Sequence, residues 1–482
     1  MKQLSFALGL VVMILLGADG AAAAGQADDA VPTFAKDVAP ILFENCAQCH
    51  RPGNIAPMSL LSFEDTRPWA RSIKDVVISR VMPPWPVDPN NSLKFRNERY
   101  LTQDQIDLIS AWVDAGAPGG NEADMPPVPD FPEGWTYTER GEPDYVFELP
   151  VEYEVAAEGE EDYIDFYSDI PWEGDKFAEV LELRPSNSAV VHHSGAYTVD
   201  LPAGKRVVDG VLVDDESARV GRDEARSSSV SQAVFNEVNL PGSSKLLSYV
   251  PGRGVERHRP GTGKRLNGDK WIRWTMHYNP IGIPQKERSK LGLWFNTAPV
   301  THEVLTRQAG NAFPTDLFGN DIYIVEGVEI KPTRDPETGR VRRAPIPNIP
   351  PYRDNWKIIG ITPINEPITL YGLSPHMHLR GKSLRWVVTY PDGAEVTLLD
   401  VPEFDFNWQI HFELEEPLYL PAGSKITGIG VYDNSLNNRW NPGPHLEVYW
   451  GQQSWDEMYQ AFTEYTVESQ DLAKDSRDTN NR

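Results

Sequence analysis

Two different periodicities of apolar residues divide the chain into a short helical part and a long strand-rich part. Near the N-terminus, apolar residues recur every three or four positions, which indicates the buried face of a helix. These residues are Val38, Ile41 and Leu42 in one stretch and Ile106, Ile109 and Val113 in another. The second stretch has clear ends, because Thr102 and Gln105 form a capping box and Gly116 with Pro118 closes the helix.

From about residue 144 to residue 466, short alternations of apolar and polar residues replace the helical pattern. Alternation at a period of two indicates half-buried strands. The clearest such segments are 271–278, 368–373, 384–390 and 425–432. Their spacing favours β-sandwich architecture, and the length favours two sandwiches. Residues 121–143, rich in Pro, Gly and acidic side chains, are the expected linker, and residues 467–482 form a polar tail.

The amino-acid composition argues against two classes of binding partner. The 482 residues include 70 Asp and Glu against 45 Lys and Arg, which gives a net charge of −25. Nucleic acids and anionic membrane surfaces bind basic faces, so neither is an expected partner. No segment beyond the N-terminal one is long and apolar enough to span a bilayer, so we expect no membrane span in the mature protein.

The first 24 residues have the pattern of a secretory signal peptide. Lys2 is the positive start, the stretch from Leu4 to Leu16 is almost wholly apolar, and Ala21 to Ala24 offer small residues for cleavage. A retained membrane anchor is the alternative, but a spanning helix needs about 20 apolar residues. We therefore expect an exported, periplasmic protein.

Both cysteines of the chain lie in one motif, Cys46-Ala47-Gln48-Cys49-His50. Thiols at this spacing add to the two vinyl groups of one haem, and the following His lies under the iron as its proximal ligand. A redox dithiol or a zinc site is the alternative, but no second Cys pair completes a zinc site. The motif predicts one covalent haem c in an all-α domain, residues 31–120, that resembles a small class I cytochrome c.

A methionine downstream is expected to bind the other face of the haem iron. Met82, in Val-Met-Pro-Pro-Trp, is the favoured ligand, because the prolines stiffen an extended segment that can hold a thioether against the haem. Met58, in Ala-Pro-Met-Ser, better suits a core position but stays the alternative ligand.

Five of the other nine histidines fall in three compact motifs. His376 and His378 would point to the same face of a strand, so they could bind one ion. His277 lies on the polar face of its own strand. His192 and His193 are adjacent, so joint binding of one ion requires a β-bulge or a strand end. Two further histidines are expected at the surface, His258 and His302, and two are expected to be structural, His411 and His445.

This concentration of histidines favours a metal, and the remaining residues limit which one. Blue copper requires a Cys thiolate, and haem takes both cysteines. An iron site of two His and a carboxylate stays open on His376 and His378 alone. Met458, in Trp-Asp-Glu-Met, is a soft thioether that would favour Cu(I) if it joined two imidazoles.

In their order along the chain, these motifs resemble the copper type II, ascorbate-dependent monooxygenases, the family of peptidylglycine α-hydroxylating and dopamine β-monooxygenases. The resemblance rests on His192-His193, His277-Tyr278, His376-x-His378 with Gly381-Lys382, and Asp456-Glu457-Met458. It covers residues from about 144 to 466 and implies two all-β jelly-roll sandwich domains, residues 144–305 and 306–466. Joined to the haem motif, the chain looks like a haem-fused bacterial branch of that family.

The resemblance implies two copper ions in two different sites. The electron-transfer copper would be held in the first domain by His192, His193 and His277. The O₂-binding copper would be held in the second domain by His376, His378 and Met458, which are the expected catalytic residues. The implied reaction hydroxylates a substrate C–H bond, and the second oxygen atom of O₂ leaves as water. The metal carries this chemistry, so no separate general base is expected.

Departures from the family pattern change the expected substrate and cosubstrate. The animal enzymes carry disulfides for which this chain has no cysteine. Ser374 stands where the peptide-hydroxylating members have a carboxylate-binding Arg, and Phe462 stands where they have a substrate-contacting Tyr. We therefore expect an apolar or neutral small-molecule substrate, with haem c passing electrons from a periplasmic donor in place of ascorbate.

Two other functions fit the same residues. One is a non-catalytic periplasmic protein that transfers electrons between haem and copper or carries copper, and it would keep every ligand. The other is a haem-tethered binding module that has lost its metals, which the presence of all six copper ligands disfavours.

Overall fold

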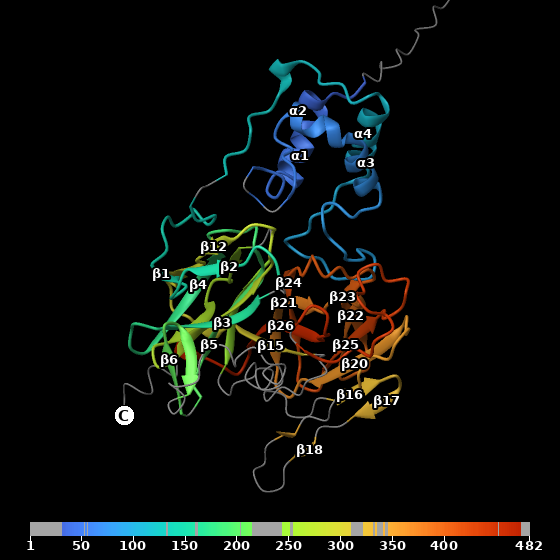
Figure 1. The fold of residues 1–482 in the computed structure, drawn as a ribbon. Coiled ribbons are helices and arrows are strands. Elements are labelled where there is room, and N and C mark those ends of the chain that lie inside the picture. The colour runs from blue at the N-terminus through green and yellow to red at the C-terminus, as the bar shows by residue number, and fades with distance from the viewer. Residues whose placement is uncertain are drawn as a thin grey trace, which may run out of the picture.

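The computed structural model describes residues 31–52, 54, 56–131, 134–159, 162–202, 204–214, 243–250, 254–309, 322–330, 333–334, 341–342, 346–451 and 453–473. The structure is mostly β-sheet, arranged as two sandwiches, with helices α1 to α4 gathered in the N-terminal part (Figure 1). The expected signal peptide, residues 1–24, lies outside these residues. Across the described ranges, no helix is both long and apolar enough to cross a membrane.

The helices of the N-terminal part surround a hydrophobic core of their own. They are α1 (Ala39–Asn45), α2 (Phe63–Thr66), α3 (Ala70–Ile78) and α4 (Gln103–Asp114), with three further short helices, η1 (Phe34–Val38), η2 (Arg67–Trp69) and η3 (Glu122–Asp124). Phe34, Leu42 and Trp112 are fully buried in this core. The predicted capping box of α4 is confirmed, because Thr102 and Gln105 each accept a hydrogen bond from the other's backbone amide.

The segment that follows α3 leaves the helical part and packs against the second sandwich. The side chains of Trp85, Val87 and Phe95 belong to the core of that sandwich. The ring of Trp85 contacts the ring of Phe412 at a centroid distance of 5.1 Å. The stretch expected to form one domain, residues 31–120, therefore contributes to two hydrophobic cores.

The first sandwich consists of a six-stranded and a four-stranded sheet. The larger sheet has the order β1 (Tyr145–Glu148), β13 (Lys290–Phe295), β4 (Asp175–Arg184), β10 (Thr262–Asn267) and β14 (His302–Glu303), and β9 (Val255–Arg257) also pairs with β4. The smaller sheet has the order β3 (Asp162–Asp169), β11 (Trp271–Tyr278), β5 (Val191–Val199) and β8 (Ser244–Tyr249). Two further pairs are β2 (Tyr153–Val155) with β12 (Gln285–Glu287), and β6 (Lys205–Val208) with β7 (Val211–Asp214).

The second sandwich repeats this arrangement of a four-stranded and a six-stranded sheet. The smaller sheet has the order β15 (Leu305–Gln308), β26 (Gln460–Val467), β21 (Ile368–His376) and β24 (Phe412–Leu420). The larger sheet has the order β17 (Val328–Ile330), β16 (Ile322–Val325), β20 (Trp356–Pro363), β25 (Lys425–Tyr432), β22 (Gly381–Thr389) and β23 (Glu395–Val401). A separate pair is β18 (Thr333–Arg334) with β19 (Val341–Arg342).

The sequence pattern predicts several of these strands closely. The strands β11 and β25 have the predicted bounds, and β25 alternates between buried and less buried positions along its length. The strand β11 differs, because seven of its eight residues are buried. Its polar face, which carries His277, is covered as well as its apolar face.

Candidate metal centre between the two sandwiches

A β-bulge brings the adjacent histidines of the first sandwich to the same place. Along the pairing of β5 with β11, His193 lies opposite His277, but the next residue of β11, Tyr278, lies opposite Val191. His192 is therefore the extra residue of the bulge, and the regular alternation of side chains is interrupted there. This is the local irregularity that adjacent histidines need in order to share one ion.

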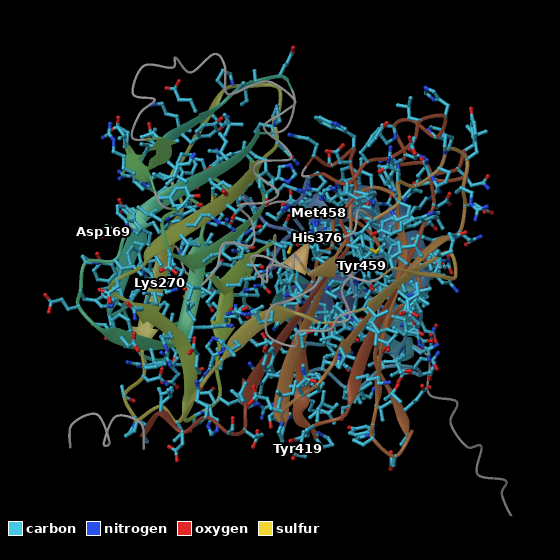
Figure 2. The ribbon with its side chains drawn as sticks, turned by 90° about the horizontal axis from the view of Figure 1, so that it is seen from below. Asp169, Lys270, His376, Tyr419, Met458 and Tyr459 are labelled. Carbon is cyan, nitrogen blue, oxygen red and sulfur yellow. The ribbon has the colours of Figure 1, made fainter. Side chains whose placement is uncertain are left out.

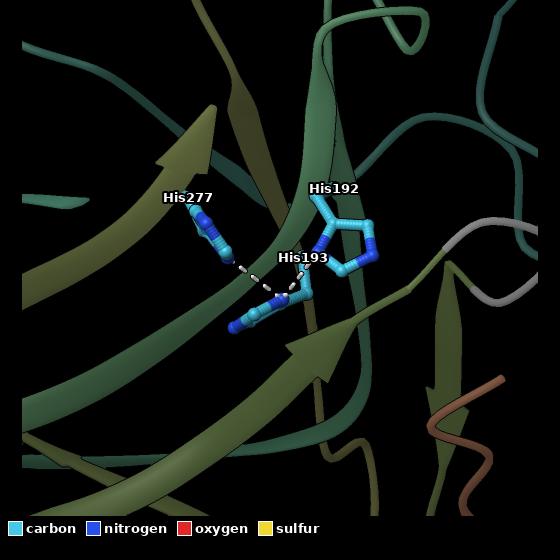
Figure 3. Close-up of side chains that lie close together, drawn as sticks. All are labelled: His192, His193 and His277. Carbon is cyan, nitrogen blue, oxygen red and sulfur yellow. Dashed lines mark hydrogen bonds between the residues drawn. The ribbon is translucent and has the colours of Figure 1, made fainter. Parts of the chain in front are cut away.

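The three histidines of this set converge through the same ring nitrogen (Figure 3). The Nδ1 atom of His193 lies 3.2 Å from the Nδ1 atom of His192 and 3.2 Å from the Nδ1 atom of His277. Two nitrogen ligands at about 2.0 Å from a tetrahedral metal lie about 3.3 Å apart, so the spacing suits one ion. Burial, followed by the charges of His277 and His192, lowers the pKa of His193 and favours the neutral, metal-binding imidazole.

The second set lies where β21 ends and β26 begins (Figure 2). The last residue of β21, His376, pairs with the first residue of β26, Gln460. His378 follows β21 by two residues and Met458 precedes β26 by two residues, so both lie just beyond this pair. The rings of His376 and His378 have a centroid distance of 5.1 Å. His378 and Met458 are buried, with exposed fractions of 3% and 4%.

Both imidazoles of the second set use Nδ1 for hydrogen bonds within the protein. The Nδ1 atom of His376 contacts the side-chain oxygen of Gln409, and the Nδ1 atom of His378 lies 3.3 Å from the carbonyl oxygen of Asp456. Each oxygen accepts, so the ring proton lies on Nδ1 and the lone pair lies on Nε2. The second set therefore presents Nε2 atoms to an ion, whereas the first presents Nδ1 atoms.

A buried carboxylate, Glu457, fixes the backbone that carries these ligands. Its Oε2 atom accepts hydrogen bonds from the backbone amides of His378 at 2.9 Å and of Met458 at 3.3 Å. Its Oε1 atom accepts from the backbone amide of Arg380 at 2.7 Å. Because one oxygen bonds both amides, the backbones of His378 and Met458 are held together. Burial raises the pKa of Glu457 to about 8.

The two histidine sets lie in direct contact across the boundary between the sandwiches. The rings of His193 and His376 have a centroid distance of 5.8 Å. The ring of Phe406 contacts one histidine of each set, with centroid distances of 4.9 Å to His192 and 5.7 Å to His378. The five histidines therefore form one continuous cluster.

Lys245 of β8 adds a positive charge to this boundary. Its Nζ atom lies 3.5 Å from the ring centroid of Phe462, and the side chain is 8% exposed. Its charge contributes to the low pKa of His376, which burial lowers to about 4. Sequence reasoning identified the five histidines and Met458 but not Lys245, Gln409 or Phe406, because only the fold brings these three residues to the cluster. It included Glu457 in the motif of Met458 but gave it no role.

The haem-attachment motif begins directly after α1. Cys46 and Cys49 are free thiols, and burial raises the pKa of the Cys46 thiol to about 12. The Nδ1 atom of His50 lies 3.3 Å from the carbonyl oxygen of Met58. A ring proton donated to that carbonyl leaves Nε2 with the lone pair that a haem iron needs, so the motif fits the group.

The two candidate methionines for the distal face of a haem differ in their surroundings. The backbone of Met58 is already bound to the proximal His50. Met82 is half-buried, and its backbone amide donates to the carbonyl oxygen of Val76 in α3 at 3.1 Å. The backbone contact of Met58 therefore favours Met82 as the distal candidate.

The expectation that His258 lies at the surface is wrong, because its side chain is only 7% exposed. His258 follows β9, and this strand lies close to β26 of the second sandwich, so the histidine is covered. His302 is half-buried, and His411 is 4% exposed. The sequence pattern around His258 contains no second motif residue that would reveal this burial.

Comparisons with known proteins do not identify a family. No family model matches the sequence, and no curated protein matches it. Among solved structures, PNGF-II has 8% identity and a TM-score of 0.25, and the match covers 67% of this chain and 65% of PNGF-II. A Paenibacillus xanthan lyase has 12% identity and a TM-score of 0.16, covering 73% of this chain and 28% of the lyase. Procruciferin, an 11S globulin from Brassica napus, has 8% identity and a TM-score of 0.13, covering 68% of this chain and 84% of the globulin.

Proposed function

We propose that the protein is a copper-dependent monooxygenase that hydroxylates a C–H bond of a small organic substrate with O₂, with electrons entering through covalently bound haem c. The observation that carries this proposal is the gathering of His192, His193, His277, His376 and His378 into one cluster at the boundary between two β-sandwiches. The backbone of Met458 is held beside that of His378 by the shared carboxylate of Glu457.

The donor atoms suit copper at both sets. His192, His193 and His277 would hold one ion through nitrogen alone, and His376, His378 and Met458 would hold the other through two nitrogens and a thioether. Copper bound at these residues would supply one-electron redox chemistry and the activation of O₂. Neutral imidazole and thioether ligands bind Cu(I) as well as Cu(II), so the ligands do not fix one oxidation state.

The helical N-terminal part is proposed to be a class I cytochrome c domain that delivers electrons to the first histidine set. Burial raises the pKa of Tyr249, and the negative charge of a Cys49 thiolate would raise it further, so Cys49 lies within electrostatic range of Tyr249 at the end of β8. Tyr249 pairs with Ser194 of β5, the residue next to His193. This range supports electron transfer from the attachment motif towards the strand that carries the first set. Covalent attachment of haem c is consistent with the proposed periplasmic location.

The decisive experiment combines metal analysis with substrate-dependent O₂ uptake. We expect one iron and two coppers per chain, and a screen of small organic substrates should give a hydroxylated product. His376→Ala and Met458→Ile should each lower substrate-dependent O₂ uptake by at least about tenfold, because each removes a ligand of the same ion. His445→Ala, which changes an exposed histidine outside both sets, is the matched control.

Zinc in place of copper, or O₂ uptake unchanged in both ligand variants, would contradict the proposal.

A second function is favoured by the direct contact between the two sets and by the position of Phe406 between them. Close contact suits a non-catalytic protein that exchanges electrons between haem and copper. That function predicts rapid haem oxidation through copper with no substrate-dependent O₂ uptake and no hydroxylated product.

A further inference from the structure

A second cluster of buried ligand-type side chains lies between the two sandwiches, apart from the histidine sets. Glu256 and His258 are two residues apart along β9 and the residue after it, so they point to the same side. Glu464 comes from β26 of the second sandwich. One ligand atom from each of these residues lies within 4.8 Å of the others, and their exposed fractions are only 6%, 7% and 6%.

Two neighbours extend this cluster around Glu464. The Nζ atom of Lys264 lies 3.0 Å from Oε1 of Glu464, and Nδ1 of His258 lies 3.8 Å from the same oxygen. The Nε2 atom of His411 lies 3.6 Å from Oε2 of Glu464. This buried set thus contains two carboxylates and one ammonium, together with two imidazoles.

The two imidazoles of this cluster give an independent observation that points to a bound species. The Nε2 atom of His258 is buried and has no hydrogen-bond partner among the residues that the structure describes, and Nε2 of His411 has the longer contact of 3.6 Å with Glu464. A buried polar atom without a partner costs about 1–3 kcal/mol, so such atoms usually have a function or a bound species. His258 and Glu464 also line a cavity of about 20 Å³, which is large enough for one small ion or one water molecule.

The arginines that line the same cavity are engaged with other groups. Arg96 forms an ion pair with Glu413, and Arg257 forms one with Glu139. Arg259 donates to the carbonyl oxygen of Glu415 at 2.7 Å. The charges of Arg96 and Arg257 are therefore balanced outside the cluster, whereas Arg259 donates to a neutral carbonyl. Lys264 is the cation that contacts Glu464 directly.

We propose that Glu256, His258 and Glu464 bind one divalent transition metal ion of the zinc type, with His411 as the fourth ligand. Two imidazoles and two carboxylates form a set that Zn²⁺ accepts in a closed, four-coordinate structural site. Lys264 also contacts the hydroxyl of Thr306. Its ammonium therefore keeps a hydrogen-bond partner when the metal ion displaces it from Glu464. This site is separate from the copper-binding sets and does not depend on the proposed activity.

An ion at this position would join the two sandwiches, because Glu256 and His258 belong to the first and Glu464 and His411 to the second. The Nδ1 atom of His411 lies 2.6 Å from Oγ of Ser374, which is two residues before His376. A fixed His411 would therefore also hold the strand that carries the second histidine set. The site therefore has a structural role, which is to fix the position of one sandwich relative to the other.

The test uses the full-length holoprotein with its histidine sets filled by copper, and the probe is Zn²⁺ alone. We expect one zinc per chain beyond the two coppers, and a rise in the midpoint of thermal unfolding when zinc is added. Glu464→Gln and His258→Gln should each weaken zinc binding by at least about tenfold. Lys264→Met should tighten it, because the competing ammonium is gone.

Glu182→Gln is the matched control, since Glu182 is a buried carboxylate of the first sandwich that bonds the backbone amides of Thr136 and Tyr137. Zinc uptake in this variant should equal that of the wild type. Cobalt in place of zinc should give the absorption of a four-coordinate site that disappears in Glu464→Gln. Absence of zinc uptake by the wild type, or equal uptake by Glu464→Gln and wild type, would overturn the proposal.

Discussion

At the scale of single residues, Glu457 determines whether the second ligand set keeps its shape. Its carboxylate accepts hydrogen bonds from three buried backbone amides, those of His378, Arg380 and Met458. We predict that Glu457→Ala lowers the free energy of unfolding by about 2–4 kcal/mol, because these amides lose their acceptor. Urea unfolding measures the effect, and the copper content of the second set should fall with it.

Glu447→Ala is the control for this prediction, because Glu447 is exposed. It should leave the urea midpoint and the copper content unchanged. Equal stability of Glu457→Ala and the wild type would show that the three amides find other acceptors.

Lys245 should tune the redox potential of copper at the second set. A buried positive charge near His376 destabilises Cu(II) more than Cu(I), so it raises the reduction potential. We predict that Lys245→Met lowers this potential and that Lys245→Arg preserves most of it, as measured by potentiometric titration of the Cu(II) signal. Lys286→Met changes an exposed lysine and should have no effect. If Lys245→Met has the same reduction potential as the wild type, the charge of Lys245 does not influence the copper.

At the scale of secondary-structure elements, the segment after α3 stabilises the second sandwich although it belongs to the N-terminal part of the chain. Trp85 is 5% exposed and contacts Phe95, Tyr100 and Phe412. We predict that Trp85→Ala lowers the free energy of unfolding by about 3–5 kcal/mol, because it leaves a cavity in this core. Denaturant unfolding measures the loss, and Trp69→Ala is the control because Trp69 is 43% exposed. A loss no larger than that of the control would mean that the segment is only loosely attached.

The same elements show which features of the fold can be predicted from the sequence and which cannot. Local patterns predicted the bounds of β11 and β25, the capping box of α4, and a bulge or a strand end at His192 and His193, where the structure has a bulge. These features depend on neighbouring residues, so the sequence around them contains the signal. Trp85 packs in the core of the second sandwich and His258 is buried, and both features depend on contacts between distant segments. No local periodicity encodes such contacts, and the same holds for the contact between His193 and His376.

At the scale of the whole molecule, the packing of three hydrophobic cores places the proposed haem and copper groups in sequence. The helical core, the first sandwich and the second sandwich contain separate buried clusters. Tyr249, which lies within electrostatic range of Cys49, pairs with the strand that carries His193, and the ring of His193 contacts that of His376 in the other sandwich. Electrons that enter at haem would therefore reach the first histidine set before the second.

This order predicts different behaviour for variants of the two sets when oxidised protein receives electrons at the haem in the presence of O₂ and substrate. In His193→Ala the electron should stay on the haem, since the first acceptor has lost a ligand, and no product should form, because each hydroxylation needs two electrons at copper. In Met458→Ile the first set is intact, so one electron should still leave the haem while product formation fails. Stopped-flow absorbance of the haem, read together with product yield, distinguishes the two cases. If the haem of the wild type stays ferrous while product accumulates, electrons reach copper by another route and the haem is not part of the catalytic chain.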